Sequence, residues 1–168
     1  RLEQAIGSVQ DVLERSATDR DEAFIGLHVE RRRVLVVGRQ ELKRRLDSGE
    51  EIVMLDTRND VEVAKGTFEN AVFWGNRNFT EFGEMAHNHI DELRDKTVVS
   101  FCTGGIRCEK AAPFLQSLGA KNVYQLQGGI LRYFEQIGHD HYRGDCFVFD
   151  ERAALDASLH AHDVSAST

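Results

Sequence analysis

Short apolar runs alternate with segments of helical periodicity from residue 34 onward, and this alternation limits the fold more than any other feature. The apolar runs are residues 34–37, 52–55, 97–101 and 122–126, and none has the polar face of a half-exposed strand. Segments such as 39–46 and 130–137 lie between or after them and repeat at helical spacing. Buried strands separated by helices indicate a parallel sheet covered on both faces. The sequence therefore predicts an α/β domain.

The residues before this pattern form a separate segment. Apolar residues recur at helical spacing within residues 2–13, and residues 23–29 have the composition of a strand. We expect a short N-terminal helix–strand extension over residues 1–33, a main domain over residues 34–158 and a flexible tail over residues 159–168. Because the chain begins with Arg1 rather than Met, we expect it to be part of a longer protein.

Composition and charge exclude several classes of protein. Hydrophobic residues make up 41% of the chain and charged residues 29%, which is typical of a globular domain. No apolar run approaches the roughly 20 residues that span a bilayer, and the charged N-terminal segment lacks the apolar core of a signal peptide. We therefore expect a cytoplasmic protein without a membrane partner. The net charge of −7 disfavours non-specific coating of nucleic acid.

Cysteine usage points to reactivity rather than to structure. Cys102, Cys108 and Cys146 are too few for a disulfide framework, and a low count without a secretory signal suits a reducing compartment. Their spacing lacks the Cys-x2-Cys pair of a zinc site, and no cysteine or carboxylate cluster completes a ligand set with the His-x-His pairs. We expect no metal and find no evident cofactor.

The segment after the apolar run 97–101 carries the strongest chemical signal. Cys102 is expected at the carboxyl end of a strand, where parallel sheets bind ligands. It is followed by Thr103, Gly104, Gly105, Ile106, Arg107 and Cys108. Adjacent glycines let the backbone point successive N–H groups inward, and the helix that begins near Arg107 adds its dipole. Such a nest favours the thiolate of Cys102 and would equally hold a persulfide anion, with Arg107 adding positive charge at an exposed rim.

Two other interpretations of this loop remain. Cysteine phosphatases resemble Cys-x5-Arg, whereas Arg107 gives Cys-x4-Arg, and a shorter ring suits a sulfur atom better than a phosphoryl group. The second alternative is a buried, unreactive cysteine at a glycine turn. It would leave the inward N–H groups without a purpose.

Three further residues are expected to support the loop. Asp56 and Arg58 follow another predicted strand, where they would form a scaffold ion pair that braces the loop. Cys108 would either pack under the loop or resolve a persulfide or disulfide at Cys102. We assign Cys146 a structural role.

These residues resemble the rhodanese superfamily. Three groups carry the resemblance: the loop 102–107, which is similar to the six-residue active-site loop; residues 55–58 with Glu62, Gly66 and Ala71, which are similar to the Asp-x-Arg…Glu…Gly…Ala signature; and Gly128 with Gly129, which are similar to the terminal Gly-Gly pair. Longer segments at 103–113, 124–131 and 144–150 resemble one subgroup, the bacterial tRNA uridine hydroxylase family.

The resemblance implies fold and activity together. It implies a rhodanese-like domain with five parallel strands flanked by helices, and hydroxylation of the tRNA wobble uridine to 5-hydroxyuridine. Cys102 would be the essential residue and molecular oxygen the co-substrate. That family usually carries an acylphosphatase-like domain before the rhodanese domain, and residues 1–33 would form the end of it. The family also carries a Cys-rich segment after the rhodanese domain, and nothing Cys-rich follows Asp156 here.

Two alternative functions stay open. In a sulfurtransferase, the Cys102 thiolate would take sulfur from a sulfane-sulfur donor such as thiosulfate and pass the persulfide sulfur to a small thiol or cyanide. A non-catalytic rhodanese module would only bind a partner, and the presence of Cys102 argues against it.

Basic residues concentrate in residues 31–45, which contain one glutamate. They are Arg31, Arg32, Arg33, Arg39, Lys43, Arg44 and Arg45. On a helix, the last three would fan around most of the surface, as on a solvated face. The alternative is a surface that contacts the phosphates of tRNA.

Overall fold

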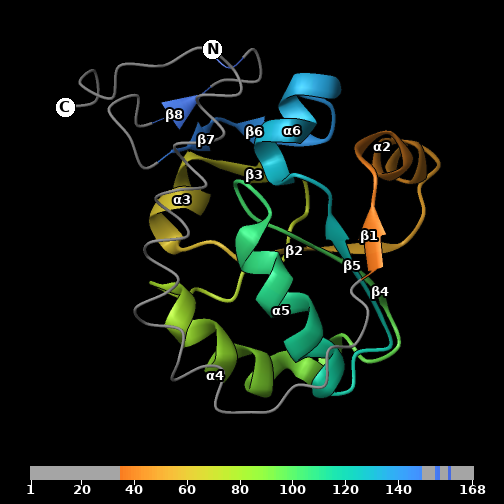
Figure 1. The fold of residues 1–168 in the computed structure, drawn as a ribbon, viewed down its shortest axis with the longest axis vertical. Helices are drawn as coiled ribbons and strands as arrows, with labels where there is room; N and C mark the ends of the chain where they lie inside the picture. The colour runs from red at the N-terminus through yellow and green to blue at the C-terminus, as the bar shows by residue number, and fades with distance from the viewer. Residues whose placement is uncertain (1–34, 149–153, 156–158, 160–168) are drawn as a thin grey trace.

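A parallel sheet of four strands forms the centre of the domain in the computed structural model, which describes residues 35–148, 154–155 and 159 (Figure 1). The strand order is β1-β5-β4-β2. These strands are β1 (Leu35–Val37), β2 (Ile52–Asp56), β4 (Thr97–Phe101) and β5 (Asn122–Leu126). The four apolar runs of the sequence therefore form strands within a residue of their predicted bounds, and the α/β class is confirmed.

The expected count of five parallel strands is wrong by one. β3 (Gly66–Phe68) pairs antiparallel with β6 (Tyr142–Gly144) in a separate two-stranded sheet. Beyond β3 the chain makes a single parallel bridge to β2, between Val72 and Leu55. The chain beside β2 thus touches the sheet at one residue pair instead of adding a strand. A third small sheet consists of β7 (Cys146–Phe147) and β8 (Ala154–Leu155).

Helices cover both faces of the central sheet (Figure 1). They are α2 (Arg39–Asp47), α3 (Asp60–Lys65), α4 (Phe79–His89), the 3-10 helix η1 (Ile90–Glu92), α5 (Ile106–Ser117) and α6 (Gly129–Gln136). The strands supply alternate side chains to the two faces, because successive side chains of a strand point in opposite directions. Val99 packs in a core with α2 and α6, whereas Val98 packs in a second core with α4 and α5.

A buried ion pair at the end of β2 connects the central sheet to β3. Arg58 donates from Nε to Oδ1 of Asp56 at 2.9 Å and from Nη2 to Oδ2 at 2.7 Å, and both side chains are fully buried. The Arg58 Nη2 atom also donates to the carbonyl of Gly66, and Thr67 Oγ1 donates to Asp56 Oδ2. The expected ion pair between Asp56 and Arg58 is present, and its role as a brace for the loop stays a prediction. The pair holds β3 directly, and the Arg58 guanidinium carbon lies 6.0 Å from the centre of the Phe101 ring, at the end of β4 next to the cysteine loop.

Two predicted segments fall on parts of the chain that the structure does not describe. The N-terminal helix–strand extension over residues 1–33 lies outside the described residues, as does the predicted tail except for Leu159. That residue is partly buried against the core that contains α6. No helix in the described part of the chain combines the length and apolar character needed to cross a membrane.

Replacing Asp56 by Ala should lower the free energy of unfolding by about 3–5 kcal/mol, because it leaves the Arg58 guanidinium buried without its counter-charge. Urea denaturation followed by circular dichroism measures this loss. Asp95→Ala is the matched control, since Asp95 pairs with Lys121 on the exposed surface and its loss should hardly move the midpoint. Equal effects of the two substitutions would contradict a bracing role for the buried pair.

Candidate functional site

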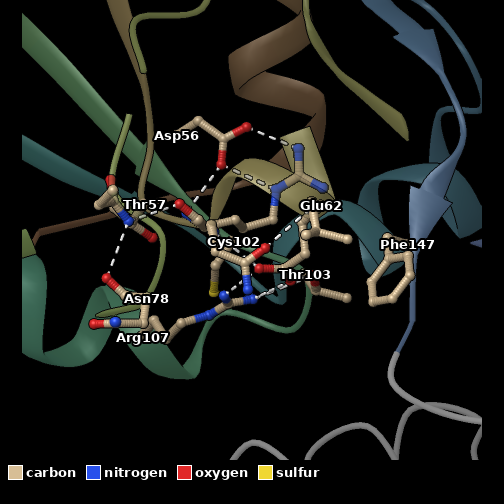
Figure 2. Close-up of polar contacts among 12 residues, drawn as sticks. Asp56, Thr57, Glu62, Asn78, Cys102, Thr103, Arg107 and Phe147 are labelled. Atoms are coloured by element: carbon tan, nitrogen blue, oxygen red, sulfur yellow. Dashed lines mark hydrogen bonds and ion pairs between the residues drawn. The ribbon is translucent and has the colours of Figure 1, made fainter. Parts of the chain in front are cut away.

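The carboxyl edge of the parallel sheet places Cys102 in a loop that joins β4 to α5. Cys102 follows Phe101, the last residue of β4, and α5 begins four residues later at Ile106. The loop residues Cys102, Thr103 and Gly105 are buried. Figure 2 shows Cys102 beside Thr103, Arg107 and Glu62. The predicted loop therefore lies on the edge of the sheet where α/β proteins bind ligands.

Backbone geometry aims a donor at the sulfur. The N–H of Gly105 donates to Cys102 Sγ at 3.0 Å. Gly105 has φ 92°, a left-handed conformation that a side chain would strain, so glycine is needed for this turn. The side chain of Gln125 on β5 donates to the Gly105 carbonyl at 2.8 Å and fixes the turn from the neighbouring strand. The predicted inward-facing nest is present.

The environment favours the thiolate of Cys102 although the residue is fully buried. Burial by itself raises the pKa. A hydrogen bond from Cys108, the positive charge of Arg107 and the backbone N–H groups of Cys108 and Arg107 outweigh it, and the pKa of Cys102 falls to about 6. A group with this pKa is mostly ionised at neutral pH. The arrangement can therefore supply a nucleophilic sulfur.

The other two cysteines have the opposite character. Burial and the adjacent Cys102 raise the pKa of Cys108 well above its ordinary value, while Thr57 Oγ1 lies 3.6 Å from its sulfur. Burial raises the pKa of Cys146 to about 12. Cys108 is fully buried in the first turn of α5, which follows the loop. Both are neutral thiols, so Cys102 is the activated one of the three.

Arg107 does not lie on an exposed rim, and that expectation is wrong. Its guanidinium donates from Nη1 to Oε2 of Glu62 at 2.6 Å and from Nη2 to Oε1 at 2.7 Å. Arg107 is 8% exposed and Glu62 is fully buried. The bidentate pair pulls the arginine inward from the first turn of α5 toward α3, because a buried guanidinium needs a counter-charge. Arg107 therefore lowers the pKa of Cys102 from a buried position, not from an exposed rim.

Glu62 is the site residue that the sequence reasoning left without a role. It stands at the third position of α3, where its carboxylate accepts from the N–H of Asn59 while the Asn59 side chain accepts from the N–H of Glu62. This reciprocal cap fixes the helix start. Thr103 Oγ1 also donates to Glu62 Oε1 at 3.2 Å. Burial raises the pKa of Glu62, but the charge of Arg107 outweighs it and the pKa is lowered. The Asn-x-x-Glu spacing predicts the cap at the start of α3, but nothing in the sequence near Glu62 predicts its ion pair with Arg107.

The start of α6 packs against the backbone of the cysteine loop. The N–H groups of Ile130 and Leu131 donate to the carbonyls of Cys102 and Thr103 at 3.0 and 3.1 Å. A Cβ atom at Gly129 would lie 2.6 Å from both carbonyl oxygens, so only glycine allows this close approach. This close approach explains the Gly128–Gly129 pair noted in the sequence, because it lets the N-terminus of α6 support the cysteine loop.

The predicted basic stretch is mostly neutralised where the structure describes it. Lys43 pairs with Asp47 at 2.6 Å, Arg44 with Glu41 at 2.7 Å, and Arg45 with Glu50. Arg44 is exposed, as expected of a solvated helix face, whereas the side chains of Lys43 and Arg45 are 31% and 17% exposed and Arg45 also lies over the Tyr124 ring. The arginines at positions 31–33 lie outside the described residues. Within the described ranges, no group of three or more His, Cys, Asp or Glu side chains could hold a metal ion.

The alkylation rate of Cys102 by iodoacetamide should rise through about pH 6 and level off near pH 7, following the thiolate fraction set by its pKa of about 6. Cys108 and Cys146 should react only in strongly alkaline solution or after unfolding, because burial raises the pKa of each. Peptide mass spectrometry of the labelled protein at each pH separates the three sites. A profile for Cys102 that rises only above pH 8 would contradict the activated loop.

Replacing Arg107 by Met should have two effects. It removes the nearest positive charge from Cys102, which should move the midpoint of the alkylation profile upward by about one pH unit. It also leaves Glu62 buried without its partner, which should lower the free energy of unfolding by about 3 kcal/mol.

The double variant Glu62→Gln with Arg107→Met separates these effects. It removes the buried carboxylate, so stability should recover in large part while the alkylation midpoint stays high. If the midpoint returns to the parent value, the backbone donors suffice to ionise Cys102 and the charge of Arg107 has no part in it.

Comparisons with known proteins agree with this geometry. A family model described as rhodanese-like domain matches residues 38–136. The chain is 64% identical over 113 residues to the tRNA uridine(34) hydroxylase of Ralstonia nicotianae, covering 67% of this chain and 40% of the relative. It is 61% identical over 124 residues to the protein of the same name from Cupriavidus necator, covering 71% of this chain and 44% of the relative. The chain thus spans less than half the length of these relatives.

Solved structures with the same fold are rhodanese-like domains. The solution structure of the rhodanese-like domain of an Anabaena protein superposes with a TM-score of 0.55 at 21% identity, covering 65% of this chain and 78% of that one. A rhodanese-like domain protein from Staphylococcus aureus gives a TM-score of 0.50 at 21% identity, covering 60% of this chain and 91% of that one. These likenesses show the fold, and the family model covers more than half of the sequence. The chain belongs to the rhodanese-like domain family.

Proposed function

We propose that this chain carries the catalytic domain of an enzyme that hydroxylates the wobble uridine of tRNA to 5-hydroxyuridine in the cytoplasm, with molecular oxygen as co-substrate. The observation that carries the proposal is the identity of about 60% to several relatives named tRNA uridine(34) hydroxylase. The proposed catalytic domain covers residues 34–158. Residues 1–33 would then be the end of a preceding acylphosphatase-like domain, and residues 159–168 a tail.

The geometry supports a nucleophilic role for Cys102 in this reaction. Its sulfur is ionised near neutral pH and accepts a hydrogen bond from Gly105. The segment from Thr103 to Cys108 holds that charge with backbone N–H groups and a helix N-terminus. Arg107, which is held in place by its ion pair with Glu62, adds a fixed positive charge near the sulfur. Asp56 and Arg58 maintain the scaffold around this edge. An activated thiolate argues against a module that only binds a partner, because binding alone needs no ionised sulfur.

A sulfurtransferase is the second candidate, and the nest around Cys102 is the observation that favours it. The thiolate would attack the outer sulfur of thiosulfate, the bond between the two donor sulfur atoms would break, and sulfite would leave with the bonding electron pair. The resulting persulfide anion would accept hydrogen bonds from the same backbone N–H groups as the thiolate does. A small thiol or cyanide would then take the outer sulfur and restore the Cys102 thiolate.

Deleting the gene in its native host should abolish 5-hydroxyuridine in tRNA, as measured by mass spectrometry of tRNA nucleosides. Complementation with the parent gene should restore the nucleoside, whereas Cys102→Ser should not, because a serine hydroxyl is not ionised at neutral pH. Cys146→Ser is the matched control and should restore it, since Cys146 is a neutral buried thiol.

Three outcomes distinguish the candidates. Restoration by Cys102→Ser would contradict a catalytic role for the thiolate. Unchanged 5-hydroxyuridine after deletion would contradict the hydroxylase. If the purified chain then forms thiocyanate from thiosulfate and cyanide, and Cys102→Ser does not, the sulfurtransferase is the better assignment.

A further inference from the structure

A cavity of about 370 Å³ opens beside the N-terminus of α2, and Arg39, Arg132, Glu135 and Gln136 line it. Two of these side chains are cationic and one is anionic. Arg132 and Glu135 pair with each other across one turn of α6 at 2.8 Å. The charge of Arg39 therefore remains as the net charge of the lining.

Arg39 differs from every other arginine in the described part of the chain, because each of the others forms an ion pair with a carboxylate. The other arginines are Arg44, Arg45, Arg58, Arg77, Arg94, Arg107, Arg132 and Arg143. Arg39 instead donates from Nε to Oε1 of Gln136 at 2.6 Å and from Nη1 to the carbonyl of Gln127 at 3.3 Å. Both acceptors are neutral. They orient the guanidinium without cancelling its charge, and Nη2 remains available to a ligand.

The cavity lies on the same edge of the sheet as Cys102. β1, β5 and β4 are neighbours in the parallel sheet, and their carboxyl ends lead into Arg39, the Gly128–Gly129 turn and Cys102 in that order. The two glycines also adjoin the cysteine loop, since a Cβ atom at Gly105 would lie 3.6 Å from the backbone nitrogen of Gly128. Helices α2, α6 and α5 all begin along this edge, so their positive dipole ends meet there (Figure 1).

We propose that Arg39 and this cavity form a contact site for a backbone phosphate of the tRNA substrate, next to the catalytic loop. The proposal rests on the proposed function, which makes RNA the substrate. A planar guanidinium held in place by two neutral acceptors can donate from Nη2 to a phosphate oxygen in a charge-assisted hydrogen bond. The net charge of the chain is −7 and repels RNA, so an unpaired cation at the catalytic edge orients the polyanion toward Cys102.

A backbone phosphate fits this site better than a free anion does. A free phosphate ion needs several donors that converge on it, whereas the lining offers one unpaired guanidinium and a carboxylate on the same cavity wall. A single contact of this kind is weak by itself. It becomes useful as one of several contacts along a nucleic acid backbone, each of which adds to affinity and to its salt dependence.

The test compares two variants of the 168-residue chain that lose the same charge from the same helix. Arg39→Gln removes the unpaired guanidinium, and Arg44→Gln removes one that is exposed and paired with Glu41. Fluorescence anisotropy measures the affinity for bulk tRNA across a range of salt concentrations, and thermal unfolding verifies the fold of each variant. Arg39→Gln should weaken binding by about fivefold at low salt and reduce the slope of log affinity against log salt by about 1. Arg44→Gln and Arg39→Lys should retain the slope of the parent.

Each other outcome overturns the proposal in a recognisable way. If Arg39→Gln and Arg44→Gln lose equal affinity for tRNA, the effect is one of net charge and not of a specific contact at Arg39. If Arg39→Gln binds tRNA as well as the parent does, or if the parent chain does not bind tRNA, the proposed contact site is contradicted. If inorganic phosphate stabilises the parent but not Arg39→Gln while both bind tRNA equally, the cavity takes a free anion instead.

The hydroxylase assignment is tested separately, because the nucleoside assay with Cys102→Ser does not depend on Arg39. Loss of hydroxylation with intact, Arg39-dependent tRNA binding would contradict only the proposed function.

Discussion

The buried ion pair between Glu62 and Arg107 is the interaction on which the cysteine loop depends. Two buried charges are costly to remove from water, and their attraction repays this cost only when the geometry is bidentate and further donors satisfy the carboxylate. Both conditions hold here, because Arg107 donates twice and Thr103 and the N–H of Asn59 also donate to Glu62. The pair ties α3 to the first turn of α5. It thereby fixes the α5 end of the loop that joins β4 to α5.

The same pair explains how a fully buried sulfur can be ionised. Burial alone would keep Cys102 neutral, as it does Cys108 and Cys146. The guanidinium of Arg107 supplies a fixed charge that water cannot screen, and the loop N–H groups supply donors that require no reorganisation. Glu62 sits on the far side of that guanidinium and holds it without contacting the sulfur. Charge and backbone together outweigh burial at Cys102, and at no other cysteine of the chain.

Much of this arrangement could be predicted from the sequence because it follows local patterns. The apolar runs predicted the four central strands, and the glycines after Cys102 predicted the inward N–H groups. The direction of Arg107 could not be predicted, because it depends on Glu62, which is 45 residues away and reaches the loop only through the packing of α3. The fifth parallel strand was implied by the resemblance alone and matched no apolar run; instead, β3 pairs antiparallel with β6, which comes from the C-terminal part of the domain.

The parallel topology also explains why the cysteine loop and Arg39 share one edge of the sheet. Each of β1, β5 and β4 ends in a glycine-containing turn that opens a helix, through Gly38, Gly128 and Gly105 respectively. The N-terminal N–H groups and positive dipole ends of three helices therefore lie beside one another. One turn holds the thiolate, the second supports that loop through backbone hydrogen bonds, and the third carries Arg39. Under the proposed function, a polyanionic substrate would contact both the first turn and the third, whereas a small sulfur donor would use the first alone.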